Sequence, residues 1–130
     1  MQSSNLKNQD DKAKFKKEFI NRLIKFSLEI IKFSNRLREE RIYWPLIDQL
    51  VRSATSIGAN VVEAKSSSSR REYIKYFEIA LKSANETKYW LLLVREIGPK
   101  FREDAERFLN ETIELAKIIG SSVLTLKGKK

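Results

Sequence analysis

Apolar residues recur every three to four positions along most of this chain, and this spacing is typical of the buried face of an α-helix. Four such stretches are separated by short breaks. The pattern predicts helices over about residues 10–40, 45–65, 70–97 and 100–126. Residues 1–9 are polar without a period and are expected to form a disordered tail, and residues 127–130 form a basic tail.

Each predicted helix carries one apolar stripe, and the first stripe is rich in phenylalanine. An aromatic ligand box is the alternative to core packing there, but the regular helical spacing favours the core. The stripes consist of Phe15, Phe19, Leu23, Phe26, Ile30, Phe33 and Leu37; Ile47, Leu50, Ala54, Ile57, Val61 and Ala64; Tyr73, Phe77, Ala80, Ala84, Leu91 and Val94; and Phe101, Ala105, Phe108, Thr112, Leu115 and Ile119.

The breaks between the stripes contain residues that start or stop helices. Pro45 suits a first helical turn and disfavours the helical region at Trp44, so the second helix is expected to open at Pro45. Tyr43 and Trp44 are expected to seal one end of the bundle, with stacking on nucleic-acid bases as the alternative. Ser69 and Glu72 match a capping box. The Gly98-Pro99 pair, at residues 98–99, is a stop signal.

Four long amphipathic helices with short connections favour antiparallel neighbours. The sequence therefore predicts an all-α protein, a single up-down-up-down four-helix bundle of one domain. A coiled coil is the alternative, and connections of a few residues make a closed bundle the better interpretation. Gly58 lies within the second helix, where a glycine usually marks a bend or a close backbone contact.

The second predicted helix carries a polar row beside its apolar stripe, offset by one residue. Small hydroxyls and an amide on such a row let another backbone approach while offering hydrogen bonds. A similar row lies on the third helix, where Ser83 and Glu86 are one turn apart. We expect this surface to serve assembly. The row on the second helix consists of Gln49, Ser53, Ser56, Asn60 and Glu63.

Composition narrows the chemistry that the chain can perform. It contains no cysteine and no histidine, which removes thiolate metal sites, disulfides and the commonest general base. Glu63 and Glu86 are a conceivable carboxylate pair, but a di-iron bundle would need histidines, and Ser53 or Ser56 has no histidine partner as a nucleophile. We expect Glu63 to pair with Arg52 or Arg71, or to form a hydrogen bond across an interface. No enzyme activity, cofactor or metal is expected.

The distribution of charge points to a polyanionic partner. The net charge is +9, and residues 1–41 hold 11 basic and 6 acidic residues. Such an excess favours phosphate contacts with RNA or DNA, whereas plain solubility is the alternative. No apolar run reaches the length of a membrane span and the start lacks a signal-peptide pattern, so a cytoplasmic location is expected. The candidate nucleic-acid contacts are Lys12, Lys14, Lys16, Lys17, Arg22 and Lys25.

Residues 49–93 carry a specific motif. The run QLVRSATSIGANVVEA, followed by a polar loop and then ALKSANE, resembles the four-helix bundle proteins encoded by intervening sequences of bacterial large-subunit ribosomal RNA genes. The matching polar positions, read as assembly or structural residues, are Arg52, Ser53, Ser56, Asn60, Glu63, Arg71, Ser83 and Glu86. The chain departs from the commoner pattern at Gly58, where proline is frequent, and at Ala64, where glycine often closes the helix.

The resemblance implies an up-down-up-down bundle that assembles as a ring-like homopentamer. It also implies a fold similar to that of the accessory variability proteins of diversity-generating retroelements, which are basic, pentameric and implicated in binding nucleic acid and a reverse transcriptase. The family has no established biochemical activity. Two hypotheses follow: a homo-oligomer that binds nucleic acid through its basic surface, or a structural adaptor that binds a protein partner without nucleic acid.

Overall fold

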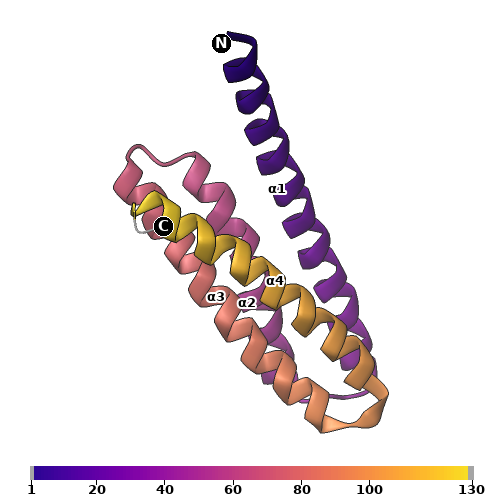
Figure 1. The fold of residues 1–130 in the computed structure, drawn as a ribbon. Helices are drawn as coiled ribbons and strands as arrows, with labels where there is room; N and C mark the ends of the chain where they lie inside the picture. Colours follow the sequence, from indigo (N-terminus) through magenta and orange to yellow (C-terminus); the bar gives the residue numbers. More distant parts are fainter. Residues whose placement is uncertain (1, 129–130) are drawn as a thin grey trace.

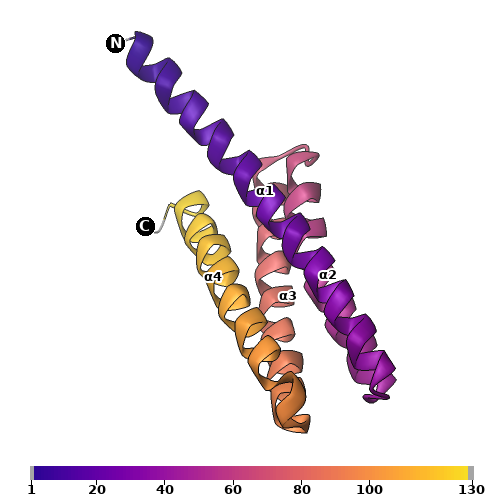
Figure 2. The same ribbon diagram turned by 90° about the vertical axis from the view of Figure 1, so that its right-hand side faces the viewer.

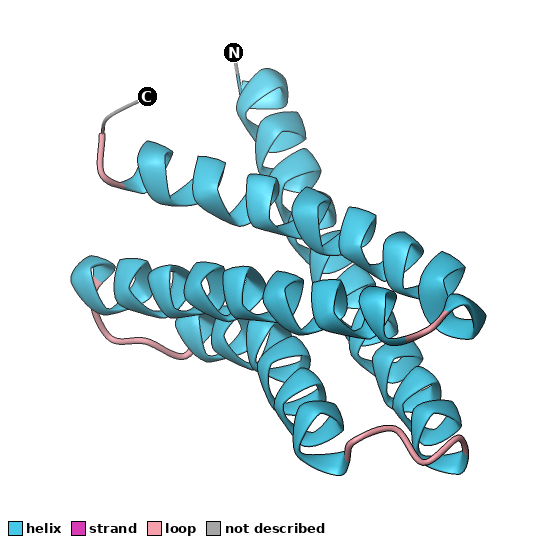
Figure 3. Cartoon of the chain, turned by 90° about the horizontal axis from the view of Figure 1, so that it is seen from below, coloured by secondary structure: helices cyan, strands magenta, loops and turns pink. Residues whose placement is uncertain are grey.

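The structure of the protein is a computed structural model that describes the backbone of residues 2–128 and the side chains of residues 9–128. Throughout these residues the regular elements are helices, and no strand is formed (Figure 3). Four α-helices follow one another, and a short 3₁₀ helix precedes the last. They are α1 (Gln2–Glu39), α2 (Trp44–Lys65), α3 (Arg70–Ile97), η1 (Pro99–Phe101) and α4 (Arg102–Leu126). The predicted all-α class with four helices is confirmed.

The helices pack side by side around one core. The α1–α2 connection and the turn that contains η1 lie at one end of the molecule, whereas the α2–α3 connection and the last turns of α4 lie at the other (Figures 1 and 2). α1 is the longest helix, and its first half projects beyond the others at that second end. No helix among the described residues is long and apolar enough to cross a membrane.

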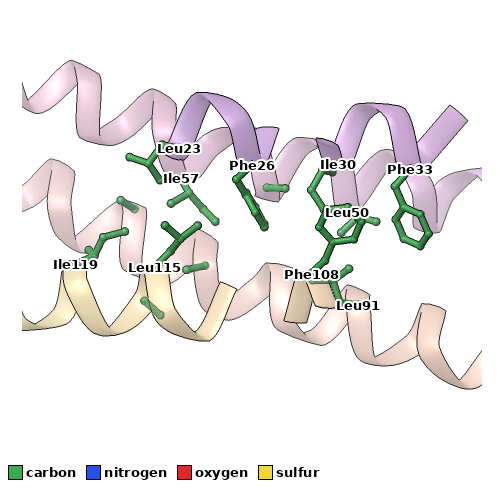
Figure 4. Packing of buried hydrophobic residues seen from close by; sticks show 14 of the residues in the cluster. Leu23, Phe26, Ile30, Phe33, Leu50, Ile57, Leu91, Phe108, Leu115 and Ile119 are labelled. Carbon is green, nitrogen blue, oxygen red and sulfur yellow. The ribbon is translucent and has the colours of Figure 1, made fainter. Parts of the chain in front are cut away.

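The core consists of the stripes that the sequence predicts, with few exceptions. Leu23 and Ile30 of α1, Leu50 and Ile57 of α2 and the facing residues of α3 and α4 are almost fully buried (Figure 4). Aromatic rings connect α1 to η1, where the ring centroids of Phe33 and Phe101 lie 6.0 Å apart in an edge-to-face contact. Burial of the stripes is the main term that holds such a bundle together.

α1 differs from the expected element at its start. The helix begins at Gln2, whereas the sequence predicts a disordered tail over residues 1–9. Residues 2–39 contain no glycine or proline, so the backbone meets no helix breaker there. Phe15 was expected in the core but is 55% exposed, because it lines an open groove between α1 and the other helices.

The end near the α1–α2 connection is closed by other residues than predicted. Tyr43 and Trp44 are 70% and 67% exposed, so the expectation that they seal the bundle is wrong. Leu46 and Phe101 are buried there instead, and Ile42 packs against the core. The two rings leave the core because Trp44 occupies the first position of α2, on the side that faces solvent.

The connections are fixed by specific hydrogen bonds. After α1, Arg41 adopts a φ of 59°, and the amides of Arg41 and Ile42 donate to the carbonyls of Arg38 and Leu37. This is a Schellman motif with arginine where glycine is usual. Ser69 accepts a hydrogen bond from the Glu72 amide at 3.1 Å and caps α3, whereas the Glu72 carboxylate accepts from Ser68 rather than completing the box.

Two small residues, Gly58 of α2 and Ser34 of α1, lie in closely packed parts of the bundle. A Cβ atom added at Gly58 would lie 3.4 Å from the Leu23 Cβ atom and 4.0 Å from the Leu23 carbonyl oxygen. The close approach expected at Gly58 is therefore an approach of α1. Ser34 of α1 is completely buried, and its hydroxyl has no hydrogen-bond partner among the described residues.

Candidate functional site

Three polar residues of the predicted row, Gln49, Ser56 and Asn60, lie on a surface shared by α2 and α3. This α2–α3 face is defined by Gln49, Arg52, Ser56 and Asn60 of α2 with Ile79, Ser83, Glu86, Trp90 and Leu93 of α3. Its rows meet because α2 and α3 pack against each other along their lengths. Five of the eight motif residues, Arg52, Ser56, Asn60, Ser83 and Glu86, therefore lie on this one face.

A hydrogen-bonded cluster centred on Arg52 occupies the middle of the α2–α3 face. The Arg52 guanidinium donates to Gln49 Oε1 at 2.7 and 3.0 Å and pairs with the Glu86 carboxylate across the two helices. Trp90 Nε1 donates to the same carboxylate at 3.2 Å. Bonds of this kind fix the orientation of a long guanidinium side chain and of the partly covered indole. The cluster joins α2 to α3 and presents an ordered polar surface.

Ser53 lies inside the bundle and not on the face. It is completely buried, and the Thr87 hydroxyl donates to Ser53 Oγ across 2.9 Å. Ser53 Oγ lies 3.3 Å from the Leu50 carbonyl, and Thr87 Oγ1 lies 2.8 Å from the Ser83 carbonyl. These contacts satisfy both buried hydroxyls, so Ser53 links helices of one subunit and is covered before any partner arrives.

The remaining polar residues of the motif behave in two ways. Ser56 donates to the Arg52 carbonyl at 2.7 Å, and Asn60 donates to the Ser56 carbonyl at 2.8 Å, so each bonds to its own helix. Glu63 and Arg71 are exposed and form no ion pair among the described residues. Neither Arg52 nor Arg71 forms the expected ion pair with Glu63 within this chain, and Arg52 pairs with Glu86 instead. The other expectation for Glu63, a hydrogen bond across an interface, stays a prediction.

Exposed apolar side chains accompany this face and form a second line on α1. Ile79, Leu93 and Ile97 of α3 are 36–48% exposed. Ile24, Leu28 and Ile31 are 40–52% exposed and stand at helical spacing on one side of α1. Core stripes alone account for neither line. The predicted core stripe of α1 contains none of Ile24, Leu28 and Ile31, so their only signal in the sequence is their helical spacing.

The six candidate nucleic-acid contacts on α1 fall into three groups. Lys14 and Lys17 point away from the bundle, whereas Lys12 and Lys16 lie on the side of α1 that continues the core stripe, as 100° per residue requires. Lys25 is exposed beside Arg22. Arg22 itself donates from Nε and Nη2 to the two Glu111 oxygens at 2.7 and 2.6 Å.

Arg22, one of the candidate nucleic-acid contacts, is paired with Glu111 within the subunit. The side-chain hydrogen bonds to Glu111 raise the pKa of the Arg22 guanidinium further above its ordinary value. The charge is compensated within the subunit, and both planar groups are engaged in a bidentate contact. The residues of α1 that stay available to a polyanion are therefore the lysines.

No group of three or more acidic side chains within the described residues is placed to hold a metal ion. Glu86 accepts from Arg52 and Trp90, and Glu63 stands apart from that cluster in the hydrogen-bond network. What the α2–α3 face offers is hydrogen-bond donors and acceptors beside apolar side chains, which is the chemistry of a contact surface.

Comparisons with known proteins agree with the motif in residues 49–93. The family described as 23S rRNA-intervening sequence protein matches residues 16–121. Among solved structures, the chain is similar to a Bacteroides thetaiotaomicron protein described as having unknown function and coming from the S23 ribosomal protein family, with 35% sequence identity and a TM-score of 0.76. That match covers 81% of this chain and 97% of the other. A search of curated proteins finds no match. Since the family match spans most of the chain and the fold agrees, the protein belongs to the family of 23S rRNA-intervening sequence proteins.

Proposed function

We propose that this protein is a non-enzymatic assembly protein that acts in the cytoplasm. Copies of an up-down-up-down four-helix bundle associate into a homo-oligomeric ring, a pentamer, and the outward lysines of α1 contact nucleic acid. The observation that carries the proposal is the pair of exposed apolar lines, Ile24, Leu28 and Ile31 on α1 and Ile79, Leu93 and Ile97 on α3. Exposed apolar patches on a small protein usually mark a protein contact.

Two different patches on one subunit suit a ring. When one patch of a subunit packs against the other patch of its neighbour, the contact is heterologous, and repeated contacts close into a ring if the rotation allows. Ser56, Asn60 and Ser83 lie between the apolar residues of the α2–α3 face and are small enough to let a neighbouring helix approach. The pentamer itself rests on the family resemblance.

The assembly is tested by the mass of the particle in solution. Leu28→Asp and Ser56→Arg are expected to shift the mass toward the monomer while the helical circular dichroism signal is kept, because both side chains are outside the core. Leu124→Asp and Asn110→Arg are matched controls on α4, with an exposed leucine and an exposed amide. If all four variants keep the mass of the wild type in light scattering, these surfaces do not assemble the protein.

The nucleic-acid contact is supported by the exposure of Lys14 and Lys17 on the projecting half of α1. Lys14 has only a long contact of 4.0 Å to Glu18, which leaves its charge largely available. Repetition of such a patch around a ring would add avidity without reading base sequence. The family's description names an intervening sequence of 23S rRNA, so RNA is the first nucleic acid to test.

Gel shifts at graded salt concentrations test this contact. Lys14→Glu with Lys17→Glu is expected to weaken RNA or DNA binding and to lower the salt dependence, by roughly one unit of slope for each phosphate that the variant no longer neutralises. Lys82→Glu on α3 is the matched control, since this lysine is exposed and lies outside α1. Equal binding by the double variant and the wild type would remove these lysines from the interface.

The second candidate function is an adaptor that binds a protein partner without nucleic acid. It is favoured by the ion pairs that compensate basic residues of the bundle body, including Arg36 with Asp104 at 2.9 Å and Arg107 with Glu29 at 3.2 Å. A partner identified by mass spectrometry that stays bound after nuclease treatment would support this function. A complex that dissociates after nuclease treatment would support the nucleic-acid function instead.

A further inference from the structure

A groove of about 1040 Å³ opens at the end of the molecule where α1 projects past the other helices. Its walls come from the first half of α1, the end of α2, the α2–α3 connection, the start of α3 and the end of α4. Phe19, Ile20, Phe77, Ile118 and Leu126 supply apolar walls, and Phe15 stands at the open side, 55% exposed.

The groove exists because α1 and α4 separate toward this end. Ion pairs join the two helices at Arg36 with Asp104, Glu29 with Arg107 and Arg22 with Glu111. Of these three ion pairs, the one at Arg22 is nearest to the N-terminus of α1, and toward that end α1 and α4 diverge in Figure 1. The apolar stripe of α1 continues past this point, so Phe15 and Phe19 face the space between the helices.

The rim of the groove is positively charged. None of its lining residues in the described part of the chain is acidic. Five basic side chains line the groove: Lys12, Lys16, Lys65, Arg70 and Lys117. Two of these have other contacts, since Arg70 donates to the Leu126 carbonyl at 3.2 Å and Lys117 lies 3.7 Å from Glu114. Lys12, Lys16 and Lys65 form no ion pair within residues 9–128, so three ammonium groups surround an apolar floor.

We propose that this groove binds an acidic amphipathic helix of a partner protein. Apolar residues of that helix would pack on Phe15, Phe19 and Ile118, and its flanking carboxylates would pair with Lys12, Lys16 and Lys65. The segments of α1 and α4 that line the groove, residues 12–20 and 117–126, are each about 12–14 Å long at 1.5 Å per residue. They match two to three turns of helix, and an amphipathic helix in an apolar groove is a common mode of recognition.

Size and exposed walls distinguish this occupant from a small molecule. The volume lies at the upper limit of pockets that enclose drug-sized ligands, roughly 300–1,000 Å³, and such pockets bury most of the ligand. The walls of this groove carry exposed side chains, so a single acyl chain would leave much of the wall surface exposed to solvent. These exposed residues are Phe15, Lys65, Ser68 and Thr125. A helix covers these walls and takes the place of the missing neighbour of α1 at this end.

The probe is a fluorescein-labelled peptide of about 14 residues with leucines at helical spacing and glutamates on both sides of the leucine stripe. Two control peptides carry lysines in place of the glutamates, or serines in place of the leucines. Fluorescence anisotropy with the full-length protein is expected to show binding of the acidic peptide and at least about tenfold weaker binding of both controls.

Variants locate the binding site. Lys16→Glu, Lys65→Glu and Phe15→Ser are each expected to weaken binding of the acidic peptide several-fold, and all three side chains are exposed, so the fold is retained. Lys32→Glu is the matched control, because it makes the same charge change on an exposed part of α1 outside the groove. Circular dichroism confirms that each variant is folded.

The proposal does not depend on a ring or on nucleic acid, because it uses lysines that face the groove and not Lys14 or Lys17. It is overturned if the acidic peptide binds no tighter than its lysine counterpart, or if Lys32→Glu weakens binding as much as Lys16→Glu. Oleate and duplex DNA are tested as two further probes. If Lys16→Glu weakens the binding of one of them but leaves peptide binding unchanged, the groove is assigned to that ligand instead. A decrease of oligomer mass in Phe15→Ser with unchanged peptide binding would assign it to a second copy of the chain.

Discussion

Replacement of Gly58 by alanine should stabilise the protein. A glycine within a helix costs about 1 kcal/mol relative to alanine, and the added Cβ atom would meet Leu23 Cβ at 3.4 Å, which is an ordinary van der Waals contact. Because the contact adds little strain, we expect a gain of about 1 kcal/mol and a rise in melting temperature of about 3–5 °C. Gly58→Val adds methyl groups toward α1 and should instead cost about 1–3 kcal/mol.

The measurement is thermal unfolding followed by far-UV circular dichroism, at one fixed protein concentration because association shifts the melting temperature. Gly120→Ala is the matched control, since its Cβ atom would lie 4.0 Å from the flexible end of Leu81 and gains the helix propensity alone. The reasoning is refuted if Gly58→Ala lowers the melting temperature while Gly120→Ala raises it. That result would mean that α1 and α2 approach more closely than a Cβ atom permits.

Two further substitutions test buried and capping hydroxyls by the same unfolding measurement. Ser34→Ala should raise the free energy of unfolding by about 1–2 kcal/mol, because it removes a buried hydroxyl without a partner among the described residues, and a loss of stability would show that this hydroxyl is bonded. Ser69→Ala should lower it by about 1 kcal/mol through loss of the bond to the Glu72 amide, whereas Ser68→Ala should change it little. Equal effects at Ser68 and Ser69 would contradict the assignment of Ser69 as the cap.

The helical core was predictable because the apolar residues that recur at helical spacing in the sequence are the residues that the bundle buries. Leu50, Ile57 and Leu91 were assigned to the core from spacing alone, and the structure buries all three. Spacing says nothing about how far the neighbouring helices reach, however. Phe15 continues the stripe of α1 by period but lines an open groove between α1 and the other helices, so its exposure could not be predicted from α1 alone.

The candidate site was predictable only in part, for a similar reason. The motif identified the surface of α2 and α3, but residues one turn apart on a helix can differ in depth. Ser53 and Ser56 belong to one polar row, yet Ser53 is buried against Thr87 while Ser56 remains at the surface. Ion-pair partners are harder still, because Arg52 had several acidic candidates and the rotation of α3 places Glu86 within reach.

Connections without glycine or proline gave the weakest signal. The Schellman motif after α1 uses Arg41 in a left-handed conformation, where arginine carries a cost that glycine would avoid. The residue type at position 41 does not predict this left-handed backbone conformation. By contrast, Ser69 was recognisable as a cap because its hydroxyl oxygen suits the free amide two or three residues later.

The projecting half of α1 continues a helix that has already been started in the core of the bundle. The costly step in making a helix is the first turn, with a nucleation constant of about 10⁻³, and the packed residues from Phe19 onward have already made it. Each further turn toward the N-terminus is added only by propagation, in register with the bundle. A ligand that contacts residues 9–18 therefore meets side chains whose direction is set by the core, and it need not supply the free energy of starting a helix.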